Sequence, residues 1–129
     1  IELDKKYKSL GFPVFAINPN DPVKVPEDSY EEMVNRSKEF AYTFPYLHDA
    51  AQQTAKAYGA ARTPHVFILT KNINNIHKIS YIGAIDDDTE NEKKDKTKYV
   101  ENALDDILKG KEPKVKETKA IGCTIKWKS

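Results

Sequence analysis

The chain has 129 residues, 39% of them hydrophobic and 32% charged, which suits one globular domain with a well solvated surface. Its formal net charge of +1 provides no long-range field for nucleic acid or an anionic membrane, so we expect neither as a partner. No run approaches the roughly 18 apolar residues that span a bilayer. The single cysteine excludes an internal disulfide and a cysteine-rich zinc site.

The first predicted element is a helix over residues 1–10. Leu3 and Tyr7 are four residues apart and share one helical face, and Gly11 is a typical helix end. No capping residue precedes the first apolar position. We therefore expect the helix to start upstream of Ile1 and the natural protein to continue in that direction.

A strand, a loop and a helix are predicted next. The unbroken apolar run 12–17 favours a strand buried on both faces of a parallel sheet, and the proline-rich segment 18–26 favours a loop. Asp28 and Glu31 form a capping-box pair, which predicts a helix start. The residues expected on the buried stripe of this helix are Tyr30, Met33, Val34, Phe40 and Ala41.

A second capping box predicts the following helix. Asp49 and Gln52 open it, and it runs to Tyr58 before Gly59 ends it. The residues on its expected inward face are Ala51, Ala55 and Tyr58. These side chains are mostly small, so we expect close packing against a sheet.

An antiparallel hairpin is predicted in the second half of the chain. Residues 65–69 form an apolar strand, residues 72–75 a turn, and residues 79–85 the returning strand. The charged stretch 86–98 has no apolar anchor, so we expect it to be mobile. Its acidic residues lack the glycine and the final glutamate of an EF-hand loop, which argues against a calcium site.

The last predicted helix covers residues 99–109, and Gly110 ends it. Its expected inward residues are Val100, Ala103, Leu104, Ile107 and Leu108. The element order is therefore helix, strand, two helices, two strands, helix. This order predicts an α/β fold with a mixed β-sheet flanked by helices.

Five segments of the chain, taken together and in their order along the sequence, resemble segments of one known family. Residues 59–69, in which Thr63 and Pro64 directly precede the second apolar strand, look like the segment that leads into the third strand of thioredoxin-fold proteins. The other four resemble the redoxin branch related to alkyl hydroperoxide reductase and thiol-specific antioxidant proteins. They are residues 16–21, 44–49, 81–86 and 117–127. The resemblance covers essentially the whole chain and implies one thioredoxin-like domain over residues 1–129.

The chain departs from this family at its start. In the family, the first central strand ends in a Cys-x-x-Cys motif that opens the first helix, and residues 1–10 would be the end of that helix. The resemblance therefore implies a domain truncated at the N-terminus, with its redox dithiol upstream of Ile1 and no catalytic residue in this chain. We expect the chain alone to be inactive. A sheet without its central strand leaves two edges unpaired, so a strand-completing partner chain or an oligomer stays open.

The resemblance implies that Thr63 and Pro64 bind substrate. A cis bond between them would turn the Thr63 backbone toward the missing cysteine pair, where it can bind an extended thiol or disulfide protein by strand-like hydrogen bonds. The alternative is an ordinary trans proline at the start of a strand.

Cys123 has two interpretations. It is an auxiliary thiol that pairs with an upstream cysteine, helped by Lys119 and Lys126 if these lie near it in space. Alternatively, it is a buried structural thiol between Ile121 and Ile125. One thiol cannot by itself run a dithiol cycle.

No metal or bound cofactor is expected. The three histidines His48, His65 and His77 have no ligand spacing, and His65 is interpreted as a structural residue. The intact protein is expected to be a thiol-disulfide oxidoreductase or thiol peroxidase that another dithiol protein reduces. The competing hypothesis is a non-catalytic thioredoxin-like module that binds proteins. Localisation stays open between cytoplasm and periplasm, because an export signal would precede this segment.

Overall fold

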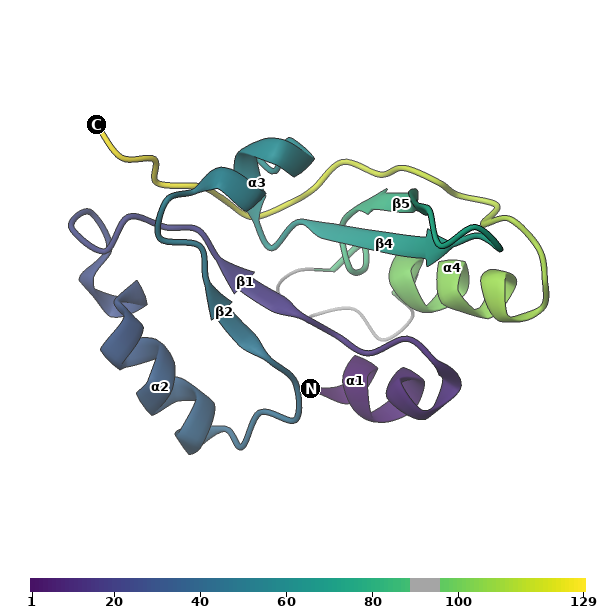
Figure 1. The fold of residues 1–129 in the computed structure, drawn as a ribbon, viewed down its shortest axis with the longest axis horizontal. Helices are drawn as coiled ribbons and strands as arrows, with labels where there is room; N and C mark the ends of the chain where they lie inside the picture. The colour runs from purple at the N-terminus through teal and green to yellow at the C-terminus, as the bar shows by residue number, and fades with distance from the viewer. Residues whose placement is uncertain (89–95) are drawn as a thin grey trace. The chain divides into compact units, whose positions relative to one another are not determined.

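The computed structural model describes residues 1–88 and 96–129. The chain divides into two compact units, which we call unit 1 (residues 1–60 and 125–129) and unit 2 (residues 61–124). Each unit has its own helices and strands (Figure 1). A single domain over the whole chain stays a prediction.

Unit 1 begins with the helix that the sequence predicts. Helix α1 spans Glu2–Tyr7, continues as a 3₁₀ turn over Lys8–Leu10, and ends at Gly11. Gly11 has a φ of 95°, a left-handed conformation that glycine adopts without steric cost. The remaining elements of this unit are β1 (Ala16–Asn18), a 3₁₀ turn (Pro26–Asp28), α2 (Tyr30–Glu39), β2 (Tyr46–His48) and α3 (Gln53–Tyr58).

Asp4 is a buried carboxylate on α1. Its Oδ1 accepts a hydrogen bond from the backbone N–H of Val14 at 3.0 Å, and its Oδ2 accepts one from the Thr43 hydroxyl at 2.7 Å. The bond from Val14, followed by that from Thr43, holds the pKa of Asp4 below its ordinary value. This side chain thereby ties two loops of unit 1 to its first helix.

The first predicted capping box is wrong by one residue. Ser29, and not Asp28, caps α2, and its hydroxyl accepts a hydrogen bond from the backbone N–H of Glu32 at 3.3 Å. Asp28 belongs to the preceding 3₁₀ turn. Its carboxylate instead forms an ion pair with Arg36 at 3.3 Å. The 3₁₀ turn delays the helix start, and so the next hydroxyl becomes the cap.

The second predicted capping box is half right. The Asp49 carboxylate accepts hydrogen bonds from backbone N–H groups at the start of α3, including that of Ala55 at 2.9 Å. Gln52 does not complete the box, because it has a left-handed φ of 61°. Its side-chain amide instead donates to the carbonyl oxygen of Pro19 at 2.7 Å. Gly59 ends the helix as predicted, with a φ of 71°.

The predicted buried faces of α2 and α3 are only partly buried. On α2, Met33 is buried, whereas Tyr30 and Phe40 are exposed. On α3, Ala55 is buried and Tyr58 is exposed. Each helix therefore has one buried residue, Met33 on α2 and Ala55 on α3.

Strands β1 and β2 run parallel, with Ala16 opposite Tyr46 and Asn18 opposite His48 (Figure 1). The parallel pairing agrees with the prediction, but the expected burial on both faces is wrong. Phe15 is 61% exposed and Ile17 is 42% exposed. In the described part of the chain β1 pairs with β2 alone, so no strand is hydrogen-bonded to its other edge there.

Unit 2 contains the predicted antiparallel hairpin. Strand β4 spans Val66–Lys71 and pairs with β5 (His77–Gly83), with a register shift at Ile68 and Leu69. The turn closes by a bond from the N–H of Asn75 to the carbonyl of Asn72 at 3.0 Å. The remaining elements are β3 (Arg62–Thr63), α4 (Tyr99–Leu108) and β6 (Cys123–Thr124).

Tyr81 of β5 is fully buried, with 0% of its surface exposed. Its hydroxyl donates to the carbonyl oxygen of Ala84 at 2.5 Å and shares a 2.6 Å hydrogen bond with the hydroxyl of Thr118. The Thr118 hydroxyl also accepts from the N–H of Ala84 at 2.9 Å. Of the residues predicted to face inward on α4, Val100, Ala103 and Leu104 are buried. Leu108 is exposed, so the prediction is wrong for that residue.

The strand pairings are both parallel and antiparallel, and helices accompany them. This confirms the predicted mixed α/β class. The strands of the described residues form three two-stranded sheets. The stretch 86–98 was expected to be mobile, and its residues 89–95 lie outside the described residues. Within residues 1–88 and 96–129, no helix is both long enough and apolar enough to cross a bilayer.

Candidate functional site

Unit 2 brings the predicted site residues Thr63, Pro64 and Cys123 together. Strand β3 pairs antiparallel with β6, so Thr63 lies directly opposite Cys123. The Thr63 hydroxyl donates to the carbonyl oxygen of Cys123 at 3.4 Å. The Thr63–Pro64 peptide bond is cis, as the resemblance implied.

Gly122 allows this close pairing. A β-carbon on Gly122 would lie 2.8 Å from the carbonyl carbon of Thr63 and 3.1 Å from Cδ of Pro64. Real side chains do not come so close to backbone atoms. Only glycine lets β6 approach the Thr63–Pro64 peptide in this way.

Cys123 is exposed and free. The alternative of a buried structural thiol is therefore wrong. Cys123 and Thr124 are the two residues of β6, and both are exposed. The structure thus leaves an accessible thiol opposite Thr63.

His65 follows Pro64 and has a partner. Its Nδ1 accepts a hydrogen bond from the backbone N–H of Ala61 at 3.2 Å, and its ring stacks on Phe67 with centroids 4.8 Å apart. Burial lowers the pKa of His65 below its ordinary value. A neutral, hydrogen-bonded imidazole agrees with the structural interpretation of this residue.

No metal centre is seen in the part of the chain that the structure describes. None of its histidine, cysteine, aspartate and glutamate side chains gather in a group of three that could hold a metal ion.

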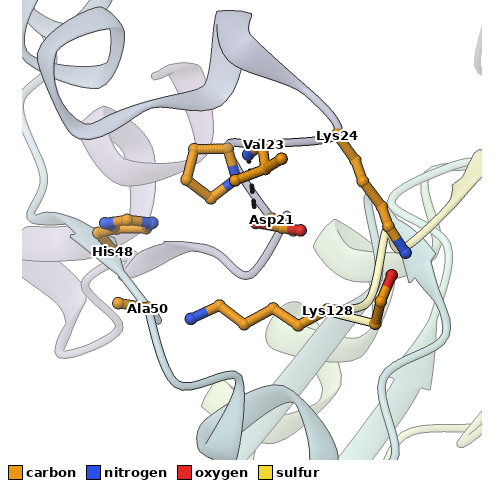
Figure 2. Close-up of a pocket in the computed structure, with 8 residues that line it drawn as sticks. Asp21, Val23, Lys24, His48, Ala50 and Lys128 are labelled. Atoms are coloured by element: carbon orange, nitrogen blue, oxygen red, sulfur yellow. Dashed lines mark hydrogen bonds between the residues drawn. The ribbon is translucent and has the colours of Figure 1, made fainter.

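Unit 1 contains a pocket that the sequence analysis did not single out (Figure 2). Its cavity volume is about 420 Å³, within the usual range for small-molecule sites. It lies where the parallel strands β1 and β2 end, because Asp21 follows β1 and His48 is the last residue of β2. The lining residues are Asp21, Pro22, Val23, Lys24, His48, Ala50, Lys128 and Ser129.

Two of the charged groups in the pocket already have partners. Asp21 accepts a hydrogen bond at Oδ1 from the backbone N–H of Val23 at 3.2 Å. The Lys24 ammonium group donates to the carbonyl oxygen of Trp127 at 2.6 Å. The first bond lies within the loop after β1, and the second holds that loop against the C-terminal segment of unit 1.

His48 and Lys128 also line the pocket, and each has a side-chain nitrogen for which no partner is seen among the described residues. Among the described residues, His48 Nε2 is the one buried side-chain nitrogen or oxygen atom without a hydrogen-bond partner. Lys128 is exposed, and its backbone N–H donates to Gln52 at 3.0 Å. Its side chain extends across the pocket toward the side on which His48 and Ala50 lie (Figure 2).

A sequence signal for this pocket did exist. His48 follows an apolar stretch, and Asp21 lies just beyond the apolar run 12–17. The carboxyl ends of neighbouring parallel strands share one edge of a sheet, where ligands commonly bind. Lys128 had no such signal, because it reaches the pocket only through the tertiary fold.

Comparisons with known proteins identify relatives of this chain. A family model described as AhpC/TSA family matches residues 1–79. The structure is similar to that of an uncharacterized conserved protein from Geobacillus kaustophilus, with a TM-score of 0.87 and 39% identity over 99% of this chain and 66% of that one. It is also similar to a hypothetical protein from Sinorhizobium meliloti 1021, with a TM-score of 0.86 and 38% identity over 99% of this chain and 68% of that one. The chain thus spans about two thirds of the length of both relatives. No curated protein matches it.

Proposed function

The chain belongs to the AhpC/TSA family, and we propose that it is the C-terminal portion of a thioredoxin-like thiol-disulfide oxidoreductase or peroxiredoxin-type antioxidant protein. Its fold is the thioredoxin-like α/β fold that the resemblance implied. The redox dithiol of the whole protein lies upstream of Ile1 in this proposal. The 129-residue chain supplies the substrate-binding and structural part.

The proposed reaction needs two upstream thiols. The first, as a thiolate, attacks a sulfur atom of a substrate disulfide, forms a mixed disulfide and releases one substrate thiolate. The second attacks that mixed disulfide, which releases the other substrate thiolate and leaves an intramolecular disulfide. Another dithiol protein restores the dithiol with two electrons and two protons. In the peroxidase version, the first thiolate attacks a peroxide oxygen, the O–O bond breaks, and an alcohol (or water, from hydrogen peroxide) leaves after taking up a proton, which converts the thiolate to a sulfenic acid. The second thiol attacks the sulfenic sulfur, releases water and forms the intramolecular disulfide.

The observation that carries the proposal is the arrangement around Thr63. Family membership predicts that the Thr63–Pro64 segment faces the cysteine pair, and β6 pairs directly with Thr63. We assign the backbone of Thr63 to strand-like hydrogen bonding with an extended protein substrate. The exposed thiol of Cys123 is proposed as an auxiliary thiol that pairs with an upstream cysteine.

The test uses the natural protein with the residues that precede Ile1, compared with the 129-residue chain. We expect the longer protein to reduce insulin disulfides or hydrogen peroxide with a dithiol reductant, and the shorter chain to be inactive. Serine in place of either upstream cysteine should abolish turnover. If the longer protein has a cysteine pair and neither activity, the proposal is wrong.

Thr63 and Cys123 are tested in the same longer protein. Thr63→Val keeps the backbone and should leave turnover nearly unchanged, whereas Pro64→Ala should raise KM for a protein disulfide more than it lowers kcat. Cys123→Ser should prevent a disulfide-linked species that mass spectrometry of the oxidised protein detects. An unchanged disulfide map in Cys123→Ser would remove the auxiliary role.

A second candidate function is a non-catalytic thioredoxin-like module that binds proteins. The observation in its favour is that this chain has one cysteine and exposes apolar side chains along β1 and β2, at Phe15, Ile17 and Leu47. A partner chain that supplies a strand would cover them. The residues before Ile1 separate the two functions: a cysteine pair there favours the oxidoreductase, and its absence favours the binding module.

A further inference from the structure

The pocket of unit 1 (Figure 2) is lined by a histidine whose buried ring nitrogen has no partner. His48 Nε2 is buried without a hydrogen-bond partner, and a buried polar group left unpaired destabilises the folded state. The ring is held on one side by stacking on Tyr30, with centroids 6.4 Å apart and an interplanar angle of 25°. His48 lines the pocket, and because the imidazole torsion χ2 is broad, its ring can turn to present Nε2 to a ligand there.

The pocket also contains a cation without a partner. The Lys128 ammonium group has no hydrogen bond or ion pair within the described residues, where only its backbone N–H is bonded. In Figure 2 it points toward the side of the pocket on which His48 lies. Lysine side chains reposition easily, so this group can follow a ligand.

One cation of the pocket is free to pair with an anion. Lys24 and Lys128 contribute two positive charges to the lining, Asp21 contributes one carboxylate, and Ser129, the last residue of the 129-residue chain, adds its α-carboxylate. Asp21 already accepts a hydrogen bond from Val23, and Lys24 is anchored on Trp127. The Asp21 carboxylate would oppose a ligand of high negative charge, which argues for a single charge.

The walls of the pocket favour an apolar body on that anion. Pro22, Val23 and Ala50 line it, together with the methylene stem of Lys128. A cavity of about 420 Å³ accommodates a small organic molecule. Its position at the carboxyl ends of two parallel strands is where ligands of α/β proteins commonly bind.

From these observations we propose that the pocket binds a small organic monocarboxylate. The carboxylate group accepts a hydrogen bond from His48 Nε2 and pairs with the Lys128 ammonium group. The apolar body of the ligand lies against Pro22, Val23 and Ala50. This binding involves unit 1 alone and needs no dithiol, so it is independent of the proposed redox function.

The test titrates the 129-residue chain with benzoate, and with benzamide as a neutral control of nearly the same shape. Imidazole ¹⁵N–¹H spectra follow His48 at constant ionic strength. We expect a saturable shift of the His48 Nε2 signal with a millimolar dissociation constant for benzoate. Benzamide should bind at least about tenfold more weakly than benzoate. Equal affinities for the two compounds, or no saturable shift at His48, would overturn the proposal.

Substitutions separate the two contacts. His48→Phe keeps a ring to stack on Tyr30 and should weaken benzoate binding about tenfold. Lys128→Met keeps the apolar stem and should weaken it roughly two- to fivefold, because the ion pair is partly exposed. Lys5, on α1, is also exposed, so Lys5→Met is the control and should leave benzoate affinity unchanged. Since Lys128 is exposed, its variant tests the pocket even if His48→Phe fails to fold, and unchanged affinity in Lys128→Met would contradict the assignment.

Discussion

Gly122 packs directly against the carbonyl group of Thr63, so that a β-carbon on Gly122 would lie 2.8 Å from the Thr63 carbonyl carbon. This contact lets β6 pair with β3 and holds Cys123 opposite the residue that precedes Pro64. The position of Cys123 opposite the candidate substrate-binding segment therefore depends on the absence of a side chain at Gly122.

We predict that Gly122→Ala destabilises the chain by about 1–3 kcal/mol, the usual cost of an overpacked site, because β6 must move away from Thr63. Urea unfolding measures this. Gly110→Ala is the matched control, since Gly110 also has a positive φ (76°) but has nothing within 4 Å of a β-carbon. The steric explanation requires Gly122→Ala to cost more than Gly110→Ala.

We predict that Tyr81→Phe costs about 1–3 kcal/mol in the free energy of unfolding. Tyr81 is fully buried, and loss of its hydroxyl leaves the carbonyl of Ala84 and the hydroxyl of Thr118 each with one hydrogen bond fewer. Tyr30→Phe, at an exposed position, should change stability by no more than about 0.5 kcal/mol. Similar losses in both variants would show that the buried network contributes little.

We predict a pH-dependent effect for Asp4→Asn. The folded-state pKa of Asp4 lies below its ordinary value of 3.8, chiefly because of the hydrogen bond from Val14 and then that from Thr43. Its ionised form therefore contributes stability above about pH 4, and this is lost as the pH falls through the folded-state pKa. Asp4→Asn should unfold at a lower temperature than the parent at pH 7, and the gap should narrow toward pH 2. A gap that stays constant with pH would mean that ionisation of Asp4 is not involved.

We predict that Cys123 reacts in the folded protein. Because the side chain is exposed, Ellman's reagent should modify one thiol per chain at a rate within about tenfold of that in urea, since access and not unfolding controls it. If the thiol reacts at an appreciable rate only when urea unfolds the protein, the thiol is covered in the folded state.

Local signals in the sequence predicted most elements. Gly11 and Gly59 end helices as expected, because a left-handed helix end depends on the residue itself. The antiparallel hairpin formed as expected, since two apolar stretches and a turn specify it locally. Choices between neighbouring candidates were less secure: Ser29 and not Asp28 caps α2, because the 3₁₀ turn before it depends on contacts beyond the local motif.

By itself, the sequence determined the α/β class, the family resemblance and the pair Thr63–Pro64 as a candidate site. Composition, apolar periodicity and short motifs report local backbone preferences, and the family segments keep their order along the chain. Only the tertiary structure decided that Cys123 is exposed opposite Thr63 and that His48 and Lys128 line one pocket. Both depend on contacts between residues 60 or more positions apart, and a contact over that separation is set by how the folded elements pack.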